Sequence, residues 1–266
     1  MLKEKYEFSE LIKIVSLLRC ENGCPWDREQ THESLKKYII EETYEVLEAI
    51  DLKSRDKLSE ELGDLLLQVV FCSQIADEEG KFNINDVITG ICRKLITRHP
   101  HIFGDVKADT PDQVNVNWEA IKKKEKGLKS QTGVLKDVPS NLPALMRSYK
   151  VQQKAAQVGF DWDNIEDVLN KVYEEIQELK DVYKSKNVER ITEEMGDAFF
   201  SLVNLSRFLD VQPELALTGT TNKFIKRFEF IENEGLKAGK RLDDMSLSEM
   251  DELWEKAKIH ISEKKD

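Results

Sequence analysis

The sequence predicts an all-α fold made of two tandem, related helical-bundle domains. Long segments carry apolar residues at positions i, i+3, i+4 and i+7, which is the spacing of one face of an α-helix. Strand-like segments, in which polar residues alternate with Val, Ile or Thr, are almost absent. Motifs of the first half also recur in the second half in the same order. The 266-residue chain is long enough for two small domains with separate cores.

Turn-forming residues separate the helical segments. The breaks lie at residues 22–25, 99–100, 104–111, 133–143, 159–163 and 235–239. The polar segment 127–143 contains two prolines and is the best candidate for a connection between domains. We therefore expect an N-terminal domain at residues 1–130, a linker at 131–143 and a C-terminal domain at 144–266.

The repeat consists of acidic, basic and aromatic motifs. Residues 41–45 read EETYE and residues 174–178 read EEIQE, and sixteen residues after the last Glu of each follow ELGD at 61–64 and EMGD at 194–197. Downstream, Lys94 and Arg98 correspond to Lys223 and Arg227, and Trp118 and Lys122 correspond to Trp254 and Lys258. Because order, residue type and spacing are kept together, we interpret the halves as a duplicated helical module.

The charge of the chain excludes proteins that coat nucleic acids. Its formal net charge is −11 and its pI is about 5.1, so the overall field repels polyanions. A phosphate-containing ligand must therefore be met by bound cations or by a local cluster of Lys and Arg. We expect no nucleic-acid partner.

The sequence also favours a cytoplasmic protein. The N-terminal residues mix Lys and Glu in a helical pattern without the apolar core of a signal peptide. No apolar run reaches the roughly 18 residues that a membrane-spanning helix needs, so we expect no membrane partner. The four cysteines lack the usual zinc or redox spacing and are expected to be reduced thiols.

The acidic side chains of each half are spaced to bind a metal ion. Glu42 and Glu45 are three residues apart, as are Glu61 and Asp64, so each pair lies on one helix face. A short turn near residues 53–56 would bring the four carboxylates together across one groove. Unpaired carboxylates in such a group repel one another, and a hard divalent cation removes this cost. The all-oxygen ligand set favours Mg²⁺, with Mn²⁺ as the alternative.

Basic residues one helical turn apart suggest a phosphate ligand. Lys223 and Arg227 can clamp phosphate oxygens, the Arg through its bidentate fork and the Lys as a point charge. Trp254 and Lys258 can present an aromatic face to a base and an ammonium group to a phosphate. Packing in a core is the simpler role for a Trp, and the repetition of the pair argues for the functional one.

These motifs resemble the MazG family of all-α nucleoside triphosphate pyrophosphohydrolases. The similarity rests on EExxE followed by ExxD and Lys-x3-Arg, and it covers nearly the whole chain. The paired arrangement, with CPWD at 24–27, RHPH at 98–101, GFDW at 159–162 and EEMGD at 193–197, is similar to the two-domain bacterial members. The resemblance implies magnesium-dependent hydrolysis of nucleoside triphosphates between the α and β phosphates, which yields a monophosphate and pyrophosphate. It also implies broad base tolerance, a homodimer, and a role in clearing or regulating nucleotide pools.

The resemblance assigns roles residue by residue. The metal ligands would be Glu175, Glu178, Glu194 and Asp197 in the second half, and Glu42, Glu45, Glu61 and Asp64 in the first. The substrate contacts would be Lys171, Glu174, Arg190, Glu193, Lys223, Arg227, Trp254 and Lys258, with first-half counterparts Lys94, Arg98, Trp118 and Lys122. Either Glu174 or Glu175 would orient the attacking water or accept its proton.

The two halves are predicted to differ in activity. Where the second half has Lys171, the first half has Tyr38, so one phosphate-facing cation is missing there. The other position keeps its charge, since Lys57 corresponds to Arg190. We therefore expect the second half to hold the main catalytic site and the first half to be weak or regulatory.

Two other classes of enzyme fit the sequence poorly, and one non-enzymatic alternative remains. A di-iron bundle needs Glu-x-x-His on two helices, and only residues 29–32 carry it. No His adjoins an Asp, which disfavours a His/Asp phosphohydrolase. The remaining alternative is a non-catalytic metal-binding scaffold or partner-binding protein, and the basic residues around the second set of acids argue against it.

Overall fold

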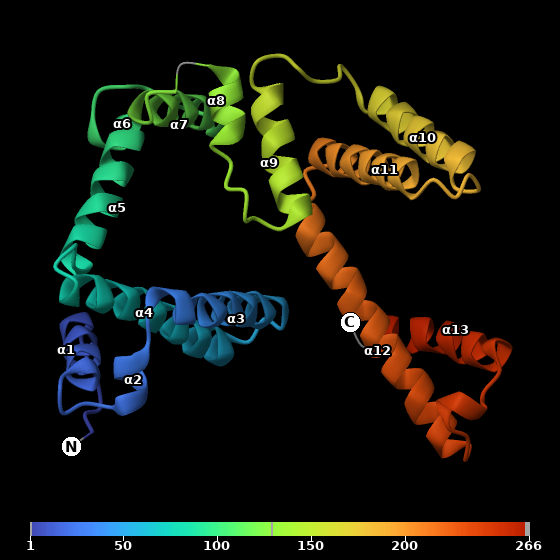
Figure 1. Cartoon of the computed structure of the whole chain (residues 1–266), viewed down its shortest axis with the longest axis horizontal. Coiled ribbons are helices and arrows are strands. Elements are labelled where there is room, and N and C mark those ends of the chain that lie inside the picture. The colour runs from blue at the N-terminus through green and yellow to red at the C-terminus, as the bar shows by residue number, and fades with distance from the viewer. Residues whose placement is uncertain (1, 129, 264–266) are drawn as a thin grey trace. The chain divides into compact units, whose positions relative to one another are not determined.

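The structure is a computed structural model that describes residues 2–128 and 130–263. The regular elements of this described part are helices, which confirms the all-α prediction (Figure 1). The chain divides into two compact units, Met1–Lys124 and Glu125–Asp266. No helix within residues 2–128 or 130–263 has the length and apolar character needed to cross a bilayer.

The first unit is centred on a hairpin of two long helices. Its elements are α1 (Phe8–Arg19), α2 (Pro25–Glu29), α3 (His32–Asp51), α4 (Arg55–Glu78), α5 (Ile84–Arg98), α6 (Pro100–Phe103) and α7 (Pro111–Glu125). Helices α3 and α4 pack against each other, and α1 packs on α4 (Figure 1). Their apolar faces form a core around Val15, Leu35, Val70, Phe71 and Ile75. This core holds the acidic segments of α3 and α4 side by side.

Local chemistry fixes the ends of the two hairpin helices. The Thr31 hydroxyl accepts a hydrogen bond from the Ser34 N–H and caps α3, and Ser54 caps α4 by accepting from the Lys57 N–H. Between the helices, Lys53 has a φ of +53°, in the left-handed region. The turn therefore falls at the place that the sequence predicted, close to residues 53–56.

The second unit repeats the hairpin. Its elements are α8 (Gln131–Lys136), α9 (Ala144–Ala156), α10 (Ile165–Val182), α11 (Val188–Phe208), α12 (Pro213–Lys237), the 3-10 helix η1 (Leu242–Asp244) and α13 (Leu247–Glu263). Helices α10 and α11 form the acidic hairpin, α9 packs on α11, and α12 pairs with α13. Asn164 and Asn187 cap α10 and α11, as Thr31 and Ser54 do in the first unit. The segment 131–143, expected to be a linker, contains α8, and the expected domain boundary at residue 130 stays a prediction.

Replacement of Leu35 by Ala should lower the free energy of unfolding by about 2–5 kcal/mol, because a buried Leu leaves a cavity that the core closes only in part. Leu35 is 2% exposed and lies against the core formed by α1, α3 and α4. Urea unfolding followed by circular dichroism measures the change. Leu2→Ala is the control, since Leu2 is 95% exposed. An unchanged urea midpoint for Leu35→Ala would contradict this description of the core.

Candidate active site

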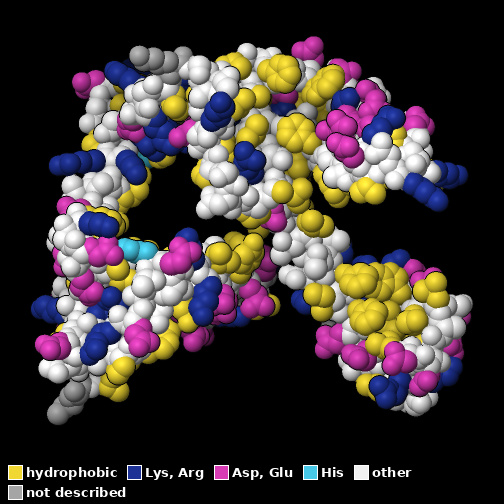
Figure 2. Space-filling model, in the orientation of Figure 1, with side chains coloured by type: hydrophobic (Ala, Val, Ile, Leu, Met, Phe, Trp, Pro, Cys, Tyr) yellow, Lys and Arg dark blue, Asp and Glu magenta, His cyan; other side chains and the backbone are white. Residues whose placement is uncertain are grey.

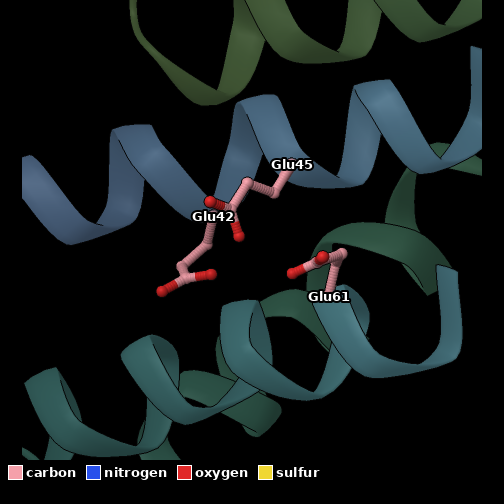
Figure 3. A group of neighbouring side chains, drawn as sticks. All are labelled: Glu42, Glu45 and Glu61. Atoms are coloured by element: carbon pink, nitrogen blue, oxygen red, sulfur yellow. The ribbon is translucent and has the colours of Figure 1, made fainter. Parts of the chain in front are cut away.

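The first unit brings three acidic side chains together. Glu42 and Glu45 on α3 and Glu61 on α4 each place a carboxylate oxygen within 4.8 Å of the others. Figure 3 shows the three side chains extending from the two helices into the space between them. Asp64, the fourth predicted ligand, lies outside this group of three, but its charge acts on Glu42. Three of the four carboxylates expected to converge therefore lie together across the hairpin.

The acids of the first unit are held in an environment that disfavours their charged form. Desolvation raises the pKa of Glu42, and the charges of Asp64, Glu45 and Glu41 raise it further. Desolvation also raises the pKa of Glu61, together with a hydrogen bond and repulsion from Glu45. A divalent cation among these oxygens would offset both causes.

The second unit repeats the cluster with different members. Glu175 on α10 and Glu194 and Asp197 on α11 place carboxylate oxygens within 4.8 Å of one another. Glu178 lies outside the group of three. The pKa of Glu194 is raised mainly by desolvation, and the charge of Glu178 and a hydrogen bond with it raise this pKa further. In each half, three of the four predicted ligands thus lie together, and the charge of the fourth raises the pKa of one of them.

Glu175 offers an open ligand atom to a cation. The residue is 6% exposed, and its Oε2 is buried without a hydrogen-bond partner among the described residues. A buried carboxylate oxygen without a partner is costly unless a cation binds it. The family resemblance implies a divalent metal, and this oxygen, next to Glu194 and Asp197, is suited to hold one.

The environment of the acids differs between the halves. Lys171 Nζ lies 2.9 Å from Glu174 Oε1 and 2.7 Å from Glu175 Oε1, and hydrogen bonds to Glu174 and then Glu175 raise the pKa of Lys171. At the matching position in the first unit, the Tyr38 ring packs edge-to-face on Trp26, with centroids 6.0 Å apart. The second unit therefore holds a cation at the acids where the first holds an aromatic pair.

The basic and aromatic residues form a second group in each half. The guanidinium of Arg227 lies 5.3 Å from the ring centroid of Trp254, and that of Arg98 lies 5.3 Å from Trp118. A cation over an aromatic face is an attractive arrangement, and its repetition supports the duplicated module. Lys223 and Lys94 lie on the same helices as these arginines and are exposed. Lys258 is paired with Glu255 at 2.5 Å.

Some residues of this group were not predicted from the sequence. The rings of Phe224 and Phe228 are stacked at 6.0 Å, and Phe224 also lies 5.1 Å from Trp254. In the first unit His99 lies 5.0 Å from Trp118. The i, i+4 spacing of Phe224 and Phe228 on one helix was the signal that could have indicated an aromatic wall beside Trp254.

The turns before the acidic hairpins play structural parts. In the first unit Pro25 starts α2 and Trp26 packs on Tyr38. In the second unit the Asp161 carboxylate accepts hydrogen bonds from both terminal nitrogens of the Arg207 guanidinium, which ties the turn to α11. Trp26 therefore packs on α3 at the start of its hairpin.

The acids and the α12 cations stay apart within one chain. The charges that act on Glu194 come from Glu178, Glu193 and Arg190, all on α10 and α11. In the described part of the chain, no hydrogen bond or ion pair joins Lys223 or Arg227 to the acids. Four of the predicted substrate contacts thus lie at the acid cluster, namely Lys171, Glu174, Arg190 and Glu193, and the α12 and α13 residues lie elsewhere in the unit.

Comparison with known proteins agrees with the repeated motifs. The model of the MazG nucleotide pyrophosphohydrolase domain matches this chain twice, at residues 30–103 and 163–230. The nucleoside triphosphate pyrophosphohydrolase/pyrophosphatase MazG of Thermotoga maritima is 49% identical, over 94% of this chain and 95% of the relative. The nucleoside triphosphate pyrophosphohydrolase of Escherichia coli K12 is 44% identical, over 95% of this chain and 97% of the relative. YabN of Bacillus subtilis is 50% identical over 95% of this chain and 52% of its own length. With both acidic hairpins inside the matched ranges and whole-length relatives of this kind, the chain belongs to the MazG nucleotide pyrophosphohydrolase family.

Proposed function

We propose that this protein hydrolyses nucleoside triphosphates, ribo- and deoxyribonucleotides alike, between the α and β phosphates, with magnesium bound by the acidic hairpin of the second unit. The observation that carries the proposal is the buried Glu175 oxygen without a partner, adjoining Glu194 and Asp197. The whole-length similarity to named nucleoside triphosphate pyrophosphohydrolases supports the reaction class.

Residues of the second unit have separate roles in the proposed reaction. Glu175, Glu178, Glu194 and Asp197 would hold magnesium, which supplies charge neutralisation on the phosphates and lowers the pKa of a bound water when it is present. Lys171, already within reach of Glu174 and Glu175, would contact phosphate oxygens beside them. The Glu174 side chain is 56% exposed and pairs with Lys171, so its carboxylate can orient a water or accept its proton. Arg190 and Glu193 lie on the same hairpin and complete its polar rim.

The proposal includes broad base tolerance, because stacking on Trp254 and Phe224 recognises an aromatic face rather than particular base edges. It includes a homodimer and a role in nucleotide-pool housecleaning or regulation in the cytoplasm. The first unit, whose Tyr38 packs on Trp26 where Lys171 stands in the second, is assigned a weak or regulatory site.

The products of the reaction test the bond that is cut. A triphosphate labelled on the α phosphate should give a labelled monophosphate, with unlabelled pyrophosphate released in equal amount. Chelation of divalent cations should lower the rate by more than about a hundredfold, because metal-bound oxygens account for several kcal/mol of charge stabilisation. Readdition of Mg²⁺ or Mn²⁺ should restore it. Labelled diphosphate, or no pyrophosphate from any nucleotide, would overturn the proposal and favour a non-catalytic metal-binding bundle.

Magnesium should also stabilise the fold. Binding to the folded state alone adds about 2.7 kcal/mol at a metal concentration one hundred times Kd. Thermal unfolding followed by circular dichroism, with and without Mg²⁺ at constant ionic strength, measures the shift in Tm. Glu175→Gln should lose most of this shift. An equal shift with K⁺ in place of Mg²⁺ would show general screening and contradict a specific site.

A further inference from the structure

We propose that an arginine at one end of each acidic hairpin holds the metal-binding carboxylates of the two helices in register. In the second unit this residue is Arg207, and in the first unit it is Arg19. Neither arginine is among the predicted metal or substrate contacts. The inference rests on the proposed function, because it assigns positioning residues to the metal site of that function.

The first argument is the ion pair that joins Arg207 to the turn before α10. The Arg207 guanidinium donates to both oxygens of the Asp161 carboxylate, with Nη1 2.9 Å from Oδ2. Asn204 Oδ1 accepts from the same guanidinium, at 3.1 Å from Nε and 2.9 Å from Nη2. The side chains of Arg207 and Asp161 are 14% and 27% exposed, so salt and water screen their pairing only in part. A bidentate pair of this kind fixes orientation as well as distance.

The Asp161 carboxylate also fixes the path of the chain into α10. Its Oδ1 accepts from the Trp162 N–H at 2.9 Å. Two residues later, the Asn164 side chain caps α10 by accepting from the Asp167 N–H at 3.0 Å. The start of α10 is therefore tied to the last turn of α11 through a short, internally bonded segment.

The first unit makes an equivalent contact with different residues. Arg19 Nε lies 2.9 Å from Glu78 Oε1 and Nη2 lies 2.7 Å from Oε2, and Glu78 is the last residue of α4. Nη1 of Arg19 donates to the backbone carbonyls of Asp27 and Gln30, in the segment that leads into α3. The Arg19 side chain is 6% exposed, and its guanidinium lies 5.3 Å from the Phe71 ring centroid. Each unit thus joins the chain before its first hairpin helix to the end of its second.

Both contacts lie at the open end of their hairpin, which is the end opposite the connecting turn (Figure 1). Glu175 is 10 residues after the start of α10 at Ile165, and Asp197 is 10 residues before Arg207. At about 1.5 Å per residue, each acid lies roughly 15 Å along its helix from the open end. The acids therefore lie between the connecting turn and the arginine contact, so the spacing of α10 and α11 at the acids is held from both ends.

The acidic cluster itself opposes this spacing. Oxygens of Glu175, Glu194 and Asp197 lie within 4.8 Å of one another, and like charges at such distances repel. Lys171 Nζ, 2.7 Å from Glu175 Oε1, offsets a part of this repulsion. Figure 2 shows further Asp and Glu side chains gathered over the α10–α11 hairpin. In the metal-free protein, a contact at the open end therefore keeps the carboxylates close enough to bind one cation.

A bound cation would join α10 to α11 by itself, because its ligands come from both helices. The arginine contact therefore acts chiefly before the metal binds, and it raises the affinity for the metal more than the rate of the loaded site. Loss of contacts that orient metal ligands typically lowers metal affinity by about tenfold to a hundredfold. A contact that only stabilised the fold would lower Tm without changing metal affinity.

Mn²⁺ binding to Asp161→Asn and Arg207→Gln chains tests the inference. Both changes are made in a Glu42→Gln chain, in which the site of the first unit is weakened, so that the second unit is measured. Electron paramagnetic resonance of free Mn²⁺ should show an affinity about tenfold lower than that of the Glu42→Gln parent. Asn at position 161 keeps an acceptor for the Trp162 N–H, so Asp161→Asn removes the charge and leaves the turn.

Kinetics of the same chains separate positioning from general destabilisation. The Mg²⁺ concentration for half-maximal pyrophosphate release should rise about tenfold, while kcat at saturating Mg²⁺ stays within about twofold. The Asp161→Asn, Arg207→Gln double variant should match the single variants, because each removes the same contact. Arg207→Lys should recover part of the affinity, since it keeps the charge and loses the bidentate fork. Lys237→Gln, which removes an α12 surface ion pair with Glu234, is the control and should change neither quantity.

Unchanged Mn²⁺ affinity, or a fall in kcat that saturating Mg²⁺ does not reverse, overturns the inference. If Arg207→Gln loses its helical circular dichroism, Asp161→Asn decides. A wild-type chain that binds Mn²⁺ and releases no pyrophosphate contradicts the proposed reaction alone, and the Mn²⁺ affinities still decide the inference. A wild-type chain that binds no Mn²⁺ overturns both.

The first unit gives an independent measurement. Glu78→Gln in a Glu175→Gln chain should lower the Mn²⁺ affinity of the first unit, because it removes the carboxylate that Arg19 holds at the end of α4. The Glu175→Gln chain without the second change is the reference. Equal affinities of the two chains would overturn the role assigned to Arg19.

Discussion

Glu175→Gln should lower kcat/KM for pyrophosphate release by about a thousandfold. The change keeps the shape of the side chain and removes the charge from the most buried acid of the second cluster, which is 6% exposed. A lost metal ligand weakens several kcal/mol of charge stabilisation on the phosphates, and about 4 kcal/mol corresponds to a thousandfold in rate. Steady-state kinetics with saturating Mg²⁺ measures the effect. Asp197→Ala, which removes a ligand from α11, should behave in the same way.

The matched control is Glu42→Gln, at the corresponding position of the first unit. It should leave at least about half of the activity, because Tyr38 there packs on Trp26 and leaves the first cluster without the cation that Lys171 gives the second. Equal losses from Glu42→Gln and Glu175→Gln would contradict the assignment of the main site to the second unit. A small loss from Glu175→Gln with an intact fold would contradict the metal site itself.

Arg227→Ala should lower kcat/KM by about a hundredfold. A charge-assisted hydrogen bond to a phosphate contributes up to about 3 kcal/mol, which corresponds to roughly that factor. The cation over Trp254 is also lost, so KM should rise as base stacking weakens. Initial rates over a range of triphosphate concentrations separate kcat from KM. Arg227→Lys should recover part of the loss, because it keeps the charge and loses the bidentate fork.

Arg98→Ala in the first unit is the position-matched control for Arg227→Ala. The Arg98 guanidinium lies at the same distance from Trp118 as the Arg227 guanidinium does from Trp254, so both variants remove the same kind of contact. The two variants differ in the unit that they alter, the first for Arg98 and the second for Arg227. We expect Arg98→Ala to change kcat/KM by less than about threefold. If both variants are equally impaired, the two halves contribute equally to turnover and the predicted asymmetry is wrong.

Much of the fold was predictable from local chemistry. The acidic hairpins, their turns and their capping residues follow from helical periodicity and from Thr, Ser and Asn at helix starts. The duplication was visible because spacing within a motif survives as a face on a helix. The short helix α8 within residues 131–136 was not predicted, since the Gly and Pro residues around it indicated an irregular segment.

The candidate site was predictable in its residue types and only in part in its geometry. Because Glu42 and Glu45 are three positions apart on one helix, they share a helix face, and the hairpin turn brings Glu61 to them. The packing of the two helices decides which of the four acids lies outside the group of three. This acid is Asp64 in the first unit and Glu178 in the second. The roles assigned to these residues stay predictions until the variants are measured.

The sequence by itself determined the helical class, the duplicated module, the two acidic clusters and the difference between Lys171 and Tyr38, because each follows from spacing along one or two adjacent helices. Only the tertiary structure decided where the groups on different helices lie. It buried one Glu175 oxygen without a partner, placed Phe224 of α12 against Trp254 of α13, and sent α12 away from the acids so that Arg227 and Glu194 are separated within one chain. The physical reason is that helical periodicity fixes the face on which a side chain lies, while the angle at which α12 leaves the α11 corner depends on packing between distant apolar surfaces.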